Sequence, residues 1–277
     1  MSADVTTSLA TVGAPQGGTA AKRFHRPSND LLRVYALRLL LAVVILVIWQ
    51  LLGDSSSRTD FFISTPRAVW DSLASLVPTG AFWVDVRTTL YEVLVGFLIG
   101  GGAGVVLGFA LAFSNTAYRV VEPLLNALNS LPRIALASLF ILYFGLGSES
   151  KIALVISLAF FPLFLNAYKG ATTVDPDYTL LMHTLKAGRL QYVAKVIFPS
   201  TVPWLVTGAK LGVAQGLGGA IIGEIISAQV GLGAALNTAS NAFDTAGEFA
   251  ILLVLIVIAM LLNALFEIAE RSTSKWR

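Results

Sequence analysis

The chain has 277 residues, a mean hydropathy of +0.76 and 13% charged residues, which is about half the charged fraction of an average soluble domain. This composition is typical of an integral membrane protein. The formal net charge of +3 is too small to indicate nucleic-acid binding. Because the chain has no cysteine, disulfides, thiolate metal sites and cysteine nucleophiles are excluded.

The N-terminal segment is small and polar before it becomes basic. It lacks a basic region followed at once by an apolar core, so a cleaved signal peptide is not predicted. We expect a disordered, basic tail over residues 1–34 and a transmembrane domain over residues 35–277.

Six segments are apolar enough to cross a membrane, which takes about 20 residues in a helix. The third is short and follows Asn129 and Pro132, so five spans remain if it is re-entrant. Pro162 should kink the fourth. The predicted spans are Tyr35–Leu52, Val93–Phe113, Arg133–Leu146, Ile152–Tyr168, Trp204–Ile226 and Phe249–Ile268.

A short helix is expected between the first and second spans. Pro66 favours the first helical position. Val69, Trp70, Leu73 and Leu76 would then share one side. Such a helix would lie at the outer membrane interface.

The distribution of Lys and Arg predicts the orientation. With the N-terminus inside, the outer segments hold only Arg58, Arg67, Arg87 and Lys151. Most of the other basic residues, Arg133 among them, then lie in inner segments or at inner span ends. We therefore expect both termini, and the long polar loop over residues 169–203, to be cytoplasmic.

Two spans carry glycine at every fourth position, which places each row on one helix face. Small residues let helix backbones approach closely in lipid, so tight packing within one subunit is the favoured interpretation. The alternative is that these faces move against each other during transport. Neither row is a phosphate-binding loop, so the chain is not expected to hydrolyse ATP. The rows are Gly96, Gly100, Gly104 and Gly108 in the second span, and Gly208, Gly212 and Gly216 in the fifth.

The fifth span also carries ionisable residues. Lys210 and Glu224 are about four helical turns apart and share a face, and Gln215 lies between them. These three residues are candidates for a pore lining, with interfacial anchoring of the two charges as an equally open alternative. No motif of a catalytic site is present, so an enzyme is not predicted.

The polar loop has the signals of a helical hairpin. Asp175 and Pro176 favour a helix start. Gly188 is expected to end this first helix in a left-handed conformation. A second helix should follow, and Pro199 and Pro203 should stop or kink the chain where it returns to the membrane.

The segment LKAGRLQYVAKVIFPSTVPWLVTGAKLG, with ISTPRAVW, LNSLPRIALASLFILYFGLGSESKI and GEIISAQVGLG in order around it, resembles ABC-importer permeases of the sulfonate/nitrate/taurine type. The resemblance implies an all-α membrane protein similar to type I importer permeases. It implies a dimer with a second permease copy, identical or not, and a periplasmic or lipid-anchored solute-binding protein. It also implies separate ABC ATPase subunits that bind ATP and Mg, so that this chain itself needs no cofactor. The implied ATPase-coupling residues are Asp175, Leu181, Leu185, Lys186, Gly188, Arg189, Val193, Phe198 and Pro199.

The hairpin departs from the family pattern. When it is aligned on Phe198 and Pro199, the family's glutamate–alanine–alanine positions fall on residues 180–182, where Leu180 is the first, and its glycine falls on Lys186. The nearest glycine is Gly188, so the turn could be shifted.

We therefore expect the permease subunit of an ATP-driven importer for a small, anionic solute, located in the cell inner membrane. The alternative is an ATPase-independent secondary transporter or channel. That alternative would need an inverted repeat or several charges near the bilayer midplane, and the sequence indicates neither.

Overall fold

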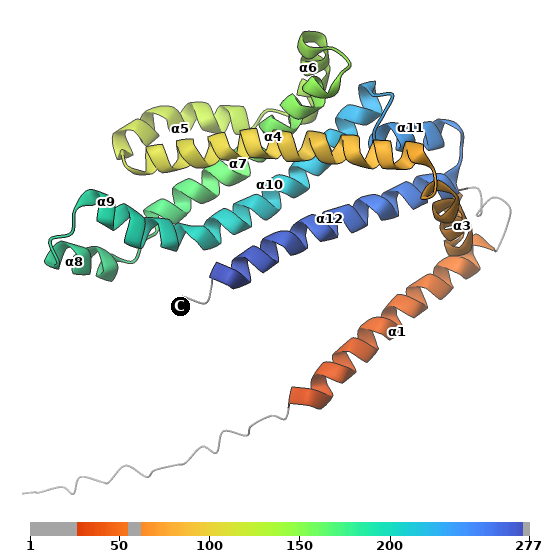
Figure 1. Cartoon of the computed structure of the whole chain (residues 1–277), viewed down its shortest axis with the longest axis horizontal. Helices are drawn as coiled ribbons and strands as arrows, with labels where there is room; N and C mark the ends of the chain where they lie inside the picture. Colours follow the sequence, from red (N-terminus) through yellow and green to blue (C-terminus); the bar gives the residue numbers. More distant parts are fainter. Residues whose placement is uncertain (1–26, 55–61, 274–277) are drawn as a thin grey trace, which may run out of the picture. The chain divides into compact units, whose positions relative to one another are not determined.

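The computed structural model describes residues 27–54 and 62–273, and in these ranges all regular elements are helices (Figure 1). The chain divides into two units, residues 1–48 and 49–277. The expected tail lies mostly outside the described residues, and its boundary at residue 34 falls within the first helix. The helices are α1 (Pro27–Gly53), α3 (Pro66–Leu76), α4 (Gly80–Ala112), α5 (Asn115–Asn129), the 3₁₀ helix η1 (Arg133–Ala135), α6 (Leu136–Phe144), α7 (Ser148–Thr172), α8 (Pro176–Thr184), α9 (Arg189–Tyr192), the π-helix η2 (Val193–Ile197), α10 (Phe198–Ser227), α11 (Leu232–Asn241) and α12 (Thr245–Thr273).

The predicted all-α membrane protein with five or six spans is confirmed. Among the described residues, five helical segments are long and apolar enough to cross a membrane, and a sixth span results if α5 and α6 are taken together. These two helices are bent by 70° at their junction. The predicted third span therefore corresponds only to the second half of a broken helix pair. The first half escaped prediction because α5 carries polar residues along one face, which lowers its mean hydropathy.

The second predicted span is also longer than expected. Helix α4 begins at Gly80, where the Thr79 hydroxyl accepts a hydrogen bond from Phe82 N at 3.3 Å. This side-chain cap satisfies one of the N–H groups that a helix start leaves unpaired. The extension adds polar residues, including Thr89 and Glu92, to a helix that was expected to begin at Val93.

Helix α7 is the centre of the bundle, and both glycine rows face it. A Cβ atom at Gly100 would lie 2.7 Å from Ile156 Cα, and one at Gly208 would lie 3.0 Å from the Pro162 carbonyl oxygen. Distances this short leave no room for a side chain, so the backbones are in direct contact. The α4 and α10 rows thus pack on two sides of one central helix and do not face each other. Helix α7 continues through Pro162 as a single helix.

A second layer covers α4 and α10. Helices α11 and α12 contribute Leu232, Ile251, Ile258 and Leu262 to a buried apolar cluster with residues of α4 and α10. The expected short helix is present as α3, which packs against α12. Val69 is buried in α3, but Trp70 is 68% exposed and does not belong to the buried side.

Candidate functional site

One end of the bundle carries the hairpin formed by α8 and α9 (Figure 1). The predicted start of α8 is present: Asp175 Oδ1 accepts a hydrogen bond from Asp177 N at 2.9 Å, and Pro176 is the first helical residue. The Thr179 and Tyr192 hydroxyl oxygens lie 2.9 Å apart, which joins α8 to α9. The loop is therefore a built hairpin with its own cap and cross-link.

The turn between these helices is a Schellman motif with Lys186 in the left-handed conformation, at φ +50°. Lys186 N donates to His183 O and Ala187 N donates to Met182 O, both at 3.0 Å. The expectation that Gly188 is the left-handed residue is wrong. Gly188 has φ −69° and ψ 159° and precedes α9 as its N-cap.

The left-handed residue is thus Lys186, the position on which the family's glycine was expected to fall. The reason is that the last carbonyl groups of α8 determine which residue must turn left-handed, whatever its side chain. Lys186 occupies that position despite its Cβ atom, and the shift of the turn toward Gly188 does not occur.

The second helix of the hairpin is continuous with the membrane span. From α9 the chain passes through the π-helix η2 into α10, and neither Pro199 nor Pro203 stops it. Pro199 follows directly on the π-helix η2, whose wider turn accommodates a residue that has no N–H group to donate. The second half of the hairpin and α10 thus form one helical stretch from Arg189 to Ser227.

The hairpin exposes apolar side chains. Leu180, Leu181, Leu185 and Leu190 are between 53% and 83% exposed. Lys186 and Arg189 are exposed beside them. Clustered exposed leucines with basic neighbours indicate an interaction surface. Of the predicted coupling residues, Asp175, Leu181, Leu185, Lys186, Gly188, Arg189, Phe198 and Pro199 are exposed, and Val193 is half-buried.

The three predicted pore residues have different environments. Gln215 is exposed and Lys210 is half-buried. Glu224 is completely buried. The structure of the single chain therefore does not bring them together along one open face of α10.

Glu224 instead belongs to a hydrogen-bonded cluster that we call the clasp, formed by Asp85, Thr89, Glu224 and the backbone of residues 231–233. Glu224 accepts from the Thr89 hydroxyl and from Gly233 N, both at 2.6 Å. Thr89 in turn accepts from Leu232 N at 2.9 Å, and Asp85 accepts from Gly231 N at 2.8 Å. Side chains of α4 and α10 thus satisfy the unpaired N–H groups at the start of α11.

Two further charged residues are buried near the clasp. Glu92 is 1% exposed and Lys151, expected in an outer loop, is 2% exposed. The Lys151 ammonium donates to the carbonyl oxygens of Leu146 at 2.5 Å and Gly147 at 3.1 Å. Both charged residues line a cavity of ≈ 440 Å³ between α4, the start of α7 and the end of α10. Sequence reasoning missed this group because the predicted span began just after Glu92.

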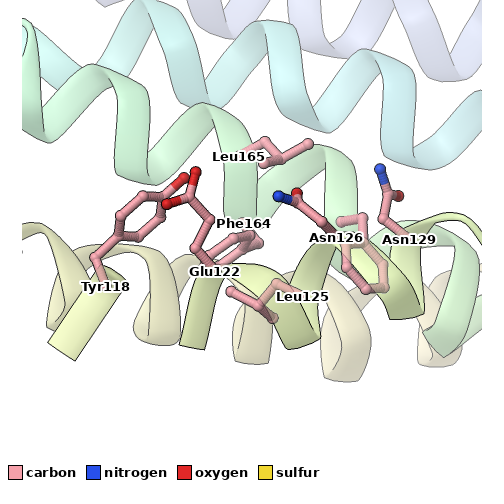
Figure 2. Close-up of a pocket in the computed structure, with 8 residues that line it drawn as sticks. Tyr118, Glu122, Leu125, Asn126, Asn129, Phe164 and Leu165 are labelled. Carbon is pink, nitrogen blue, oxygen red and sulfur yellow. The ribbon is translucent and has the colours of Figure 1, made fainter. Parts of the chain in front are cut away.

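Helix α5 carries a row of polar side chains. Figure 2 shows Tyr118, Glu122, Asn126 and Asn129 following one another along α5, with Leu165 of α7 opposite. They line a small cavity of ≈ 50 Å³. Their spacing of four, four and three residues is that of one helix face, which is the signal that could have identified the row.

Arg133 lies at the break that follows this row. Its guanidinium is 4.6 Å from the centre of the Phe161 ring, near the middle of α7. Its Nη2 atom donates to the backbone and side-chain oxygens of Asn129. Arg133 was expected at an inner span end, whereas its guanidinium lies beside the middle of α7, a helix that is long and apolar enough to cross a membrane.

Comparisons with known proteins agree on one family. The model of the "Binding-protein-dependent transport system inner membrane component" family matches residues 102–275. The riboflavin transport system permease protein RibX of Chloroflexus aurantiacus is 30% identical over 234 residues, which are 84% of this chain and 87% of RibX. The nitrate import permease protein NrtB of Leptolyngbya laminosa is 27% identical over 228 residues, which are 80% of this chain and 81% of NrtB.

A solved structure shares the fold. A chain of the methionine ABC transporter MetNI, in inward-facing conformations, superposes with a TM-score of 0.56 over 75% of this chain and 94% of its own length. Its sequence identity is 21%.

Proposed function

Because the chain belongs to the family of binding-protein-dependent transport system inner membrane components, it is the permease subunit of an ABC importer, and we propose that the α8–α9 hairpin is its docking site for the ATPase subunits. Such a permease is not itself the enzyme. ATP and Mg are bound, in this proposal, by the separate ATPase subunits, and the hairpin receives their movement.

The observation that carries the proposal is the exposed leucine cluster on the hairpin. A solvated loop gains nothing from four exposed leucines, whereas a protein interface buries them. Lys186 and Arg189 supply a basic rim suited to acidic groups on the partner. Because α9 is continuous with α10, a displacement of the docked hairpin moves a helix that spans the membrane.

The hairpin and both chain ends are, in this proposal, cytoplasmic. Lys169, Lys186, Arg189 and Lys195 all belong to this one connection, and basic residues gather in cytoplasmic segments. The opposite end of the bundle, with the clasp and α11, then faces the solute-binding protein.

The translocation path is proposed to run between two permease copies. Two relatives are named for the solutes riboflavin and nitrate, so the family includes permeases for both uncharged and anionic solutes. Family membership therefore does not decide the charge of the solute of this chain.

The docking site is tested by co-purification of this chain with its ABC ATPase subunits. The double variant Leu185→Asp, Leu190→Asp places two carboxylates on the exposed cluster and should abolish the association, while Trp70→Asp should preserve it. Trp70 is a matched control because its exposed fraction of 68% is close to the 66% of Leu185 and it lies on α3, away from the hairpin. An unchanged complex with the double variant would refute the docking site. Solute uptake by the purified chain without any ATPase would refute ATP-driven coupling.

A further inference from the structure

The break between α5 and α6 lies beside the middle of α7, a helix that is long and apolar enough to cross a membrane. The two helices are bent by 70° around residues 130–132, and Arg133 packs on Phe161 near the middle of the spanning helix α7. At membrane depth, irregular backbone is tolerated only where it is buried in protein or lines a water-filled cavity. Broken helices near the midplane are also where transporters hold their solutes.

Arg133 has no acidic partner at this depth. In the described part of the chain its contacts are Asn129 and the Phe161 ring, and its Nε atom is buried without an acceptor. Holding a guanidinium in a span is costly unless a counter-charge or water reaches it. Arginine is also the side chain best suited to bind a planar or tetrahedral oxyanion.

The polar row of α5 leads to this residue. Asn126 and Asn129 are exposed in the single chain; they follow Glu122 along α5 (Figure 2) and precede Arg133 in the sequence. Glu122 lies beside Tyr118, at the other end of the row from Asn129 (Figure 2). The apolar side of the same helix carries Val120, which is 75% exposed, as expected for a surface in contact with lipid.

We propose that the break is a solute contact within the translocation path, where Arg133 attracts the anionic group of the solute and the polar face of α5 lines the route to it. This assignment rests on the proposed function in that it takes the chain to be half of a transport path. It deepens that function by naming the residue and the helix face that contact an anionic solute.

The test uses the absence of cysteine from the chain. Asn126→Cys introduces a single thiol on the polar row without removing the Asn129 contacts of Arg133. Its reaction rate is measured in membrane vesicles that contain the chain together with its ATPase subunits. The probes are an anionic and a cationic methanethiosulfonate reagent, carrying a sulfonate and a trimethylammonium group respectively. Val120→Cys, on the apolar side of the same helix, is the control for lipid exposure.

We expect the Asn126→Cys thiol to react and the Val120→Cys thiol not to react. Adding Arg133→Gln should lower the ratio of anionic to cationic reaction rates about tenfold, the effect of one charge roughly 10 Å away in a poorly screened site. Arg133→Lys should preserve the ratio because it keeps the charge. Arg119→Gln should also preserve it, since Arg119 is as far from Asn126 in sequence as Arg133 but is exposed.

Two results would overturn the proposal. Equal reactivity of the two thiols would remove the polar row from an aqueous path. A rate ratio that Arg133→Gln leaves unchanged would show that this residue does not select anions. Both readings are independent of ATPase docking, which the co-purification experiment reports separately, so a failure of either proposal is recognised on its own.

Discussion

The left-handed lysine in the hairpin turn predicts that Lys186→Gly stabilises the hairpin. Lys186 has φ +50°, a conformation that costs a residue with a Cβ atom about 1–2 kcal/mol. Glycine removes this strain but loses about 0.5–1 kcal/mol through the greater freedom of the open chain. The net stabilisation of the closed turn should therefore be about 0.5–1 kcal/mol.

Hydrogen exchange of the turn amides measures this free energy. The N–H groups of Lys186 and Ala187 are bonded to carbonyl oxygens of α8, so they exchange only when the turn opens. A stabilisation of about 0.5–1 kcal/mol slows their exchange roughly two- to fivefold. Mass spectrometry on a peptide that covers the turn, with the protein in lipid nanodiscs, provides the readout.

Gly188→Ala is the matched comparison. Gly188 has φ −69°, and a Cβ atom there would meet no atom within 4 Å. Alanine should therefore leave the exchange unchanged or slow it slightly. Faster exchange in Gly188→Ala, together with no gain in Lys186→Gly, would refute the assignment of the left-handed position.

Two further substitutions test the bundle by thermal unfolding in detergent. Thr89→Val removes a hydroxyl that both donates and accepts within the clasp, leaving two buried groups unpaired. Thr89→Val should lower the free energy of unfolding by about 2–4 kcal/mol. The control is Thr88→Val, whose hydroxyl bonds within its own helix and which should change the free energy of unfolding by less than about 0.5 kcal/mol. Equal effects of the two variants would contradict the clasp. Gly104→Ala forces a Cβ atom into the backbone of α7 around Phe160 and should cost about 1–3 kcal/mol. Gly102→Ala meets no neighbour within 4 Å and should be neutral or stabilising, so similar melting of the two alanine variants would argue against direct contact of α4 with α7.

The helices and the hairpin could be predicted from local chemistry. Long apolar runs determine membrane helices because the backbone must satisfy its own hydrogen bonds in lipid. The start of α8 follows from the Asp175–Pro176 pair because capping involves only neighbouring residues. Glycine at every fourth position marked the packing faces of α4 and α10 for the same local reason.

The partners of those faces and charges were decided only by the tertiary structure. Periodicity shows that a glycine row will be buried, but not that both rows pack on α7. Nor does it show that Glu224 accepts hydrogen bonds from Thr89, which is 135 positions away, and from Gly233 in helix α11. Arg133 seemed to be a span-end charge until the 70° break placed it beside the middle of α7. Composition and local signals thus determine which segments become helices and where those helices start, because these depend on neighbouring residues and on lipid. Only the three-dimensional packing decides which polar groups meet inside the membrane, because those contacts join residues that the sequence keeps far apart.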